Sequence, residues 1–211
     1  MKRALVISPH PDDEAIGCGG TVRKHVLDGD EVHVIFLTSG EKGGHGRDEL
    51  RTGMLRERES EAAKKILGVH DIEFYREPDG AVRVRRALVE RLAAKLRGWR
   101  PHVVYVPHER EMHADHRAAW RLVRAALRAT QNGVAAPVVR MYEVWTPLAR
   151  MDDIVDITPY VKNKRQAIRA YRSQCAVMSF DDAALGLNRY RGEMFCWPAG
   201  EYAEVFAKLE P

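Results

Sequence analysis

The sequence predicts a single α/β domain in which a mostly parallel sheet carries helices on both faces. Short apolar runs rich in β-branched residues alternate along the chain with longer segments of helical periodicity. No repeat, low-complexity tract or linker divides the 211 residues, a length that suits one compact core. We therefore expect one domain spanning residues 1–211.

The elements are expected in a regular order up to residue 130 and a less regular one after Pro147. Apolar, β-branched runs predict strands at Ala4–Ser8, Glu31–Thr38, Ile72–Tyr75, His102–Val106, Val138–Trp145 and Ile154–Ile157. Helical periodicity predicts helices at Glu14–Leu27, Asp48–Leu67, Val82–Leu96, Ala114–Thr130, Pro159–Ser173, Asp181–Tyr190 and Glu201–Leu209. Gly68 is expected to close the second of these helices.

Composition and charge argue against several classes of protein. The 34 Lys and Arg residues against 30 Asp and Glu residues leave little long-range field, so we expect no nucleic-acid partner. Three widely separated cysteines, Cys18, Cys175 and Cys196, are typical of packing residues rather than of a disulfide framework. The apolar run at the start is too short for a signal peptide, and no stretch is long enough to span a membrane. We expect a cytoplasmic protein.

Two polar clusters follow strands that the common doubly wound order 3-2-1-4 makes neighbours. Ser8 to Glu14 comes directly after the first strand, and His113 to His116 comes after the fourth. The carboxyl ends of these strands form the crevice where ligands bind in such sheets. The topology therefore predicts that the two clusters meet in one site.

The residue types of these clusters predict a catalytic zinc site. His10, Asp13 and His116 supply the three nitrogen or oxygen ligands that such a site needs, with one position left for water. Asp12 is then free to act on that water as general base, and His113 to stabilise the oxyanion of a hydrolysed amide. We expect Asp115 to orient a histidine, with Glu14 as a further candidate for such support. Capping of a helix by Pro-Asp-Asp-Glu is the structural alternative, but it does not explain His10 or the second cluster.

These residues resemble the LmbE-like or PIG-L family of N-acetylglucosaminyl deacetylases. The shared motifs are the His10–Glu14 segment and the later His113–His116 segment, and the similarity extends to Gly17–Thr21, Leu37–Glu41, Arg56–Gly68 and Lys164–Gln174. The resemblance implies a Rossmann-like domain, zinc on His10, Asp13 and His116, Asp12 as base, and His113 as acid or oxyanion stabiliser partnered by Asp115. It also implies an N-acetyl amino sugar, or a conjugate of one, as substrate, and a homo-oligomer.

The sequence departs from the family pattern at two places. Ala114 stands where many members carry proline, a change that should leave the ligands in place. Glu111-Met112 stands where some members place a tyrosine near the scissile carbonyl, so help from an aromatic hydroxyl is not expected.

Other features allow two interpretations each. Arg56, one turn from Glu59, is either part of a solvated helix face with intrahelical ion pairs or, as in similar family positions, a contact to the sugar. Gly40–Arg47 is either a loop that closes over substrate or a plain solvent loop. Gly17, Gly19 and Gly20 lack the spacing of a nucleotide-binding motif, so we expect close packing beneath the metal site. The four tryptophans, Trp99, Trp120, Trp145 and Trp197, are interpreted as core or interface residues.

Three alternatives to a sugar deacetylase stay open. The same metal site could remove an acyl group from a non-sugar amide. Two histidines and one carboxylate also form the ligand triad of non-haem iron oxygenases, although those sites usually lie on β-barrels. A binding module with a structural metal would need a closed coordination shell and would have no use for Asp12.

Overall fold

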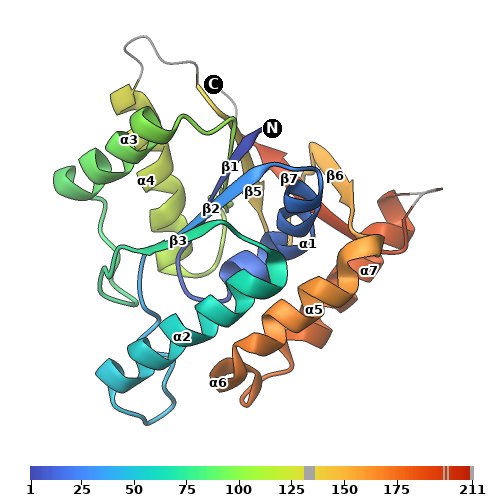
Figure 1. Cartoon of the computed structure of the whole chain (residues 1–211), viewed down its shortest axis with the longest axis horizontal. Helices are drawn as coiled ribbons and strands as arrows, with labels where there is room; N and C mark the ends of the chain where they lie inside the picture. Colours follow the sequence, from blue (N-terminus) through green and yellow to red (C-terminus); the bar gives the residue numbers. More distant parts are fainter. Residues whose placement is uncertain (131–135, 197, 199, 210–211) are drawn as a thin grey trace.

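Seven strands form one sheet in the computed structural model, which describes residues 1–130, 136–196, 198 and 200–209 (Figure 1). Their order across the sheet is β3-β2-β1-β4-β5-β7-β6. The strands are β1 Arg3–Ser8, β2 Glu31–Phe36, β3 Asp71–Phe74, β4 Val103–Pro107, β5 Val138–Tyr142, β6 Asp153–Asp156 and β7 Ala203–Lys208.

Helices cover both faces of this sheet. They are α1 Asp13–Leu27, α2 Glu49–Leu67, α3 Arg86–Trp99, α4 Ala114–Thr130, η1 Thr158–Tyr160, α5 Val161–Ala170, α6 Arg172–Cys175 and α7 Phe180–Phe195. Figure 1 shows α3 and α4 on one side of the sheet and α1, α2, α5 and α7 on the other. No helix in the described ranges is long and apolar enough to cross a membrane.

The alternation of side chains along β1 explains how one strand serves both cores. Leu5 and Ile7 pack with α3 and α4, whereas Ala4 and Val6 pack with α1, α2 and α5. A strand that is buried on both faces has no side that faces water, and its sequence is therefore a continuous apolar run.

The predicted fold class and the order of the first four strands are confirmed. The pairings of β1 with β2 and β4, of β2 with β3, and of β4 with β5 are all parallel. The carboxyl ends of β1 and β4 therefore lie side by side, where the two polar clusters were expected to meet.

The helix predicted at Glu201–Leu209 is wrong. Residues 203–208 form β7, which pairs antiparallel with both β5 and β6. Glu204 carries a charge within this strand, but its carboxylate is buried and receives a hydrogen bond from Lys164 Nζ at 2.6 Å. A strand that is buried along most of its length needs such a partner for any charge that it carries.

Other differences concern the ends of elements. The helix predicted from Val82 begins at Arg86, and the helix predicted at Pro159–Ser173 is divided into η1, α5 and α6. The division between α5 and α6 is at Tyr171, whose buried side chain donates a hydrogen bond to Glu14 Oε1 at 2.5 Å. Cys18, Cys175 and Cys196 are free thiols, and only the first is fully buried.

The glycines of α1 pack closely against the sheet, as predicted. A Cβ atom at Gly17 would lie against the Tyr142 ring of β5, and one at Gly20 would lie 2.7 Å from Ile157. Only glycine allows α1, which begins at Asp13, to come this near to the strands. Its first turn is thereby held at the carboxyl end of β1.

Candidate metal centre and active-site pocket

Hydrogen bonds between strand ends fix the loop that follows β1. The backbone amide of Thr38, just beyond β2, donates to Pro9 O at 3.1 Å, and the Thr38 hydroxyl donates to the same oxygen at 3.0 Å. The Ser8 hydroxyl donates to His10 O at 2.8 Å. His10 is therefore placed on the crevice by the same two strands that form its wall.

Asp12 has a strained backbone conformation at the start of α1. Its φ is +128°, a value that a non-glycine residue rarely adopts, and its side chain makes no capping hydrogen bond within the described residues. Asp12 therefore does not cap α1, although Glu14 Oε2 accepts a hydrogen bond from the Asp12 amide at 3.2 Å in the first turn. Backbone strain of this kind costs about 1–3 kcal/mol and is concentrated at functional sites.

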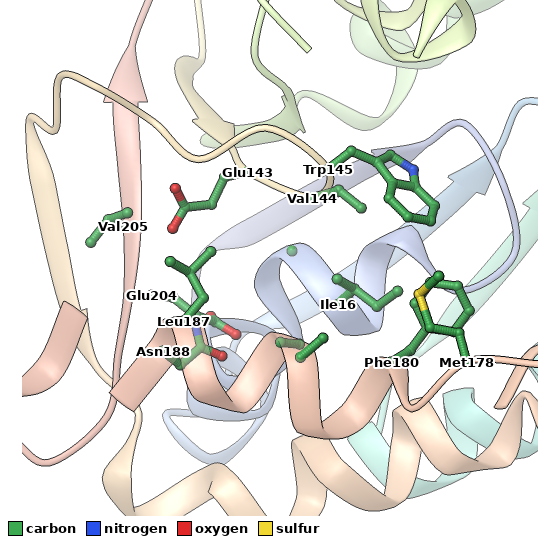
Figure 2. Close-up of a pocket in the computed structure, with 13 residues that line it drawn as sticks. Ile16, Glu143, Val144, Trp145, Met178, Phe180, Leu187, Asn188, Glu204 and Val205 are labelled. Carbon is green, nitrogen blue, oxygen red and sulfur yellow. The ribbon is translucent and has the colours of Figure 1, made fainter. Parts of the chain in front are cut away.

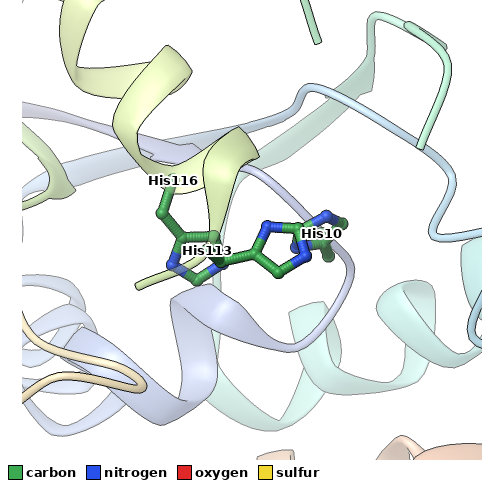
Figure 3. Close-up of side chains that lie close together, drawn as sticks. All are labelled: His10, His113 and His116. Atoms are coloured by element: carbon green, nitrogen blue, oxygen red, sulfur yellow. The ribbon is translucent and has the colours of Figure 1, made fainter. Parts of the chain in front are cut away.

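The second cluster lies at the beginning of α4 and faces the first. The His10 ring centroid is 4.7 Å from that of His113 and 5.4 Å from that of His116. Figure 3 shows the three imidazoles gathered at the end of α4. The predicted meeting of the two clusters is confirmed.

One oxygen of Asp13 lies between two of these imidazoles. Asp13 Oδ2 is 3.1 Å from His10 Nδ1 and 3.2 Å from His116 Nε2. Ligand atoms on a tetrahedral zinc, with bonds of about 2.0–2.1 Å, are about 3.3 Å apart. Burial raises the pKa of Asp13, but the adjacent imidazoles outweigh burial and hold it well below its usual range. Asp13 is thus an ionised carboxylate, as a metal ligand must be.

His116 provides the clearest test of whether a metal fits these residues. It is completely buried, yet neither ring nitrogen has a hydrogen-bond partner among the described residues. Asp13 Oδ2 is 3.2 Å from Nε2 but not in hydrogen-bond geometry. A buried imidazole without a hydrogen bond is costly unless an ion takes its lone pair. Two groups of side chains in the described part of the chain could hold a metal: His10, His113 and His116, and His10, Asp79 and Asp115.

Asp115 and Asp79 surround the far side of the His10 ring. His10 Nε2 is 3.2 Å from Asp115 Oδ2 and 3.1 Å from Asp79 Oδ1. Burial lowers the pKa of His10, but hydrogen bonds to carboxylates, Asp115 and Asp13 foremost, raise it well above the ordinary value. Asp115 also accepts hydrogen bonds from the Gly80 and Val82 amides, at 2.7 and 3.0 Å. The carboxylate predicted to orient a histidine is therefore beside His10, whereas only its backbone amide approaches His113, at 3.2 Å from Nδ1.

Asp12 is paired with an arginine rather than with a metal ligand. Arg56 Nη2 donates to Asp12 Oδ2 at 2.9 Å, and Nη1 donates to Gly40 O at 2.9 Å. Arg56 is only 4% exposed, so the interpretation of this residue as part of a solvated helix face is wrong. Burial raises the pKa of Asp12 to about 7, against the opposing charge of Arg56. A carboxyl group with this pKa can exchange a proton near neutral pH.

Glu111 connects the metal cluster to the loop after β5. Its Oε1 accepts hydrogen bonds from the backbone amides of Val144 and Trp145, at 2.7 and 3.0 Å. Its other oxygen, which has no hydrogen-bond partner among the described residues, is 3.7 Å from His116 Nδ1. Where some relatives place a tyrosine, this chain has a buried carboxylate that fixes Trp145.

The cluster opens into a pocket of about 320 Å³ with two unlike walls. One wall is charged and includes Asp12, Arg56, Asp79 and, from the Gly40–Arg47 loop, Lys42 and His45. The other wall is apolar and consists of Trp145, Val177, Met178 and Phe180. His113 lies at this pocket, and burial together with the charge of His10 lowers its pKa. Whether the Gly40–Arg47 loop closes over substrate stays a prediction.

Glu14 and the tryptophans complete the sequence predictions for this region. Burial raises the pKa of Glu14 to about 8, and its carboxyl oxygen accepts a hydrogen bond from Tyr171. Trp99 stacks on His33 at 4.0 Å between ring centroids, and Trp120 packs on the core, whereas Trp145 lines the pocket. Trp197 lies outside the described residues.

Asp79 is a charged pocket residue that the sequence analysis did not single out, as it also did not single out Val177, Met178 and Phe180. It lies in a Pro78-Asp79-Gly80 turn soon after β3, at the same edge of the sheet as the two histidine clusters. Hydrogen bonds, above all to His10, outweigh burial and lower its pKa. The sequence could have revealed Asp79 in one way. An Asp-Gly turn follows the predicted strand at Ile72–Tyr75, and a parallel strand so close to the site places such a turn near it.

Comparison with known proteins identifies related chains. A model of the PIG-L family, described as GlcNAc-PI de-N-acetylase, matches residues 5–127. A diacetylchitobiose deacetylase of Thermococcus kodakarensis is 31% identical over 197 residues, which cover 82% of this chain and 70% of that protein. The structure of an N,N'-diacetylchitobiose deacetylase from Pyrococcus horikoshii matches with a TM-score of 0.87 and 26% identity over 99% of this chain and 84% of that one.

A different activity occurs among the relatives. A 4-oxalmesaconate hydratase of Pseudomonas putida is 30% identical over 193 residues, which cover 82% of this chain and 74% of that protein. The relatives of this chain therefore include both a deacetylase and a hydratase.

Proposed function

Because the chain belongs to the PIG-L family, whose model is described as GlcNAc-PI de-N-acetylase, we propose that it is a zinc-dependent N-deacetylase. Its substrate is an N-acetylglucosamine-type sugar or a conjugate of one, which it hydrolyses to acetate and a free amine. One observation carries the proposal: His10 and His116 converge on Asp13 Oδ2, with the carboxylate of Asp12 adjacent in sequence and lining the same pocket.

His10, Asp13 and His116 are the proposed zinc ligands. They offer two imidazoles and one carboxylate, a donor set that zinc uses in catalytic sites. When bound, zinc polarises a carbonyl and makes a water more acidic. His113, which lies at the pocket and is only partly buried, is then left for the substrate.

Asp12 and His113 move the protons in this proposal. Asp12 takes a proton from the water that attacks the amide carbonyl, so that a C–O bond forms and the C–N bond breaks. His113 stabilises the oxyanion or donates a proton to the departing nitrogen. The products are acetate and an amine, which together contain the atoms of the amide and one water.

Arg56 and Asp115 are proposed to support these groups. Arg56 holds the Asp12 carboxylate and lines the pocket, where it contacts the substrate. Asp115 fixes the ring orientation of His10 through Nε2, in the manner of carboxylates that support metal-bound imidazoles. The cytoplasmic location and the homo-oligomeric state stay predictions, and light scattering after size-exclusion chromatography measures the second.

The decisive experiment measures amine and acetate together. Purified zinc-loaded protein is incubated with N-acetylglucosamine, diacetylchitobiose and an inositol conjugate, and both products are quantified. Asp12→Asn should keep its metal and its fold while amine release falls by about 10²–10⁴-fold, the usual contribution of a general base. Asp28→Asn, an exposed aspartate at the other end of α1, is the matched control.

Each outcome separates the candidate functions. Equal amounts of acetate and amine establish amide hydrolysis, and the best substrate distinguishes a sugar from another amide. A protein that binds zinc but hydrates a conjugated acid without releasing amine would resemble the hydratase relative instead. Full activity of Asp12→Asn would remove this residue from the mechanism and contradict the proposal.

A further inference from the structure

A second cavity lies directly behind the apolar wall of the active-site pocket. It measures about 110 Å³ and lies between α1, α7 and the strand ends of β5 and β7. Trp145, Met178 and Phe180 line both this cavity and the active-site pocket. Figure 2 shows these three side chains together at one end, with Glu143 and Val205 at the other.

The lining of this cavity is predominantly apolar. Aliphatic side chains come from α1, from the loop after β5, from α7 and from β7, namely Ile16, Val144, Ala183, Ala184, Leu187 and Val205. The two acidic residues in the lining are neutralised, because Glu143 receives a hydrogen bond from Arg191 at 2.8 Å and Glu204 one from Lys164 at 2.6 Å. Neither charge therefore demands a cation in the cavity.

The apolar wall between the active-site pocket and the second cavity contains large apolar side chains that are exposed to solvent. Trp145 is 42%, Val177 56% and Met178 48% exposed, although they lie around one pocket rather than singly on the surface. A group of exposed apolar residues of this kind marks a binding surface. The backbone of Trp145 is also held by Glu111, so this wall is fixed relative to His116.

We propose that the substrate of this site carries a short apolar group, which enters the cavity behind Trp145, Met178 and Phe180. This inference rests on the proposed function and adds a substrate class to it: an acylated amino compound with an alkyl chain of roughly three to five carbons. An apolar cavity of about 150 Å³ holds benzene, so this smaller space of about 110 Å³ suits a short alkyl chain rather than an aromatic ring.

The apolar group belongs either to the acyl chain or to the amine portion, and two homologous series distinguish these sources. The first varies the acyl group of glucosamine from acetyl through propionyl and pentanoyl to octanoyl. The second keeps the acetyl group and varies the glycoside of N-acetylglucosamine from methyl through propyl to pentyl. In one series kcat/KM should rise about fourfold per buried methylene, or about sixtyfold for three, and then fall once the chain exceeds the cavity.

Two variants fill the cavity from α7. Ala183→Leu and Ala184→Leu each add a branched chain to the lining at a small cost in helix propensity. Each variant should abolish the increase of kcat/KM with chain length. The value of kcat/KM for the longest chain that the wild type accepts should then equal the value for the shortest chain. Ala87→Leu, at an exposed position of α3 that lines neither space, should keep the wild-type ratio.

Binding measured without turnover keeps this test separate from the reaction. Calorimetric titration of both series into the zinc-loaded protein and into the two filled variants gives the dependence of Kd on chain length. Chain-dependent binding that the variants lose, without amine release from any compound, would support the cavity and overturn the proposed reaction. Rates and affinities that are flat in both series, or a rise that survives in both filled variants, would overturn the inference and leave the deacetylase proposal intact.

Discussion

Residues up to 130 and residues from 136 onward supply different kinds of side chain to the active-site pocket. Among the described residues, the first part supplies both groups of potential metal donors and Asp12, and it contains the 5–127 segment matched by the family model. The second part supplies the apolar wall, through Trp145 in the loop after β5 and the segment between α6 and α7. We infer that the reaction is encoded in the first part and substrate choice in the second.

Removal of a metal donor should give the largest effect and tests the role of the first part. His116→Ala deletes a completely buried imidazole that forms no hydrogen bond with the described residues and faces the Asp13 carboxylate. Metal content should fall far below one equivalent, and amine release should fall about a thousandfold, since a catalytic metal contributes several kcal/mol. Elemental analysis and product assays measure the two losses.

An exposed histidine serves as the control for this change. His102 lies just before β4, at the end of that strand opposite to His116. His102→Ala should keep both metal and activity. Retention of one metal equivalent and full turnover by His116→Ala would break the assignment of the metal chemistry to this cluster.

The second prediction concerns the contact that joins the two parts. Glu204 of β7 accepts hydrogen bonds from the amides of Gly20 and Thr21 in α1, at 2.8 and 2.7 Å, and from Lys164 Nζ. Glu204→Ala leaves the two amides without their acceptor and the buried ammonium without a carboxylate partner, with only Ile16 O still accepting from it. We therefore expect a loss of about 3–5 kcal/mol in unfolding free energy. Urea denaturation with matched metal content measures it.

Two further variants sharpen this result. Glu201→Ala removes an exposed carboxylate that pairs with Arg189 and should change stability by less than about 1 kcal/mol. Lys164→Met combined with Glu204→Met should recover much of the loss, because no unpaired charge is then buried. If Glu204→Ala is as stable as the wild type, this ion pair does not hold the second part to α1.

The same division explains what could be predicted from the sequence. His10, Asp12, Asp13 and His116 were predictable because each lies in the loop or the first helical turn that follows an apolar strand, and parallel strands bring such positions to one edge. The strand order that makes β1 and β4 neighbours was predictable on the same topological grounds.

Buried charges were the main obstacle to prediction in the second part. Lys164 and Glu204 are 40 positions apart, and each alone has the pattern of a solvent-facing residue. Their pairing compensates the charge that is buried in the strand at 203–208, and a pairing over this distance is invisible to local periodicity, which predicted a helix there. Asp79 was missed for a related reason, since its contact with His10 depends on a loop held by Asp115.

The smallest predicted effect tests how closely the two parts must pack. At Gly20, a Cβ atom would lie 2.7 Å from the side chain of Ile157, which is itself fully buried just after β6. Gly20→Ala should therefore cost about 1–3 kcal/mol of unfolding free energy through overpacking.

Gly186, in the middle of α7, has no atom within 4 Å of an added Cβ, so Gly186→Ala should instead stabilise by roughly 0.5–1 kcal/mol. Opposite signs for the same substitution, measured by urea denaturation, would show that contact between α1 and the second part, and not helix propensity, requires glycine at position 20. A stabilising Gly20→Ala would mean that α1 can move away from Ile157, and the metal ligands at its first turn would then not depend on the second part for their position.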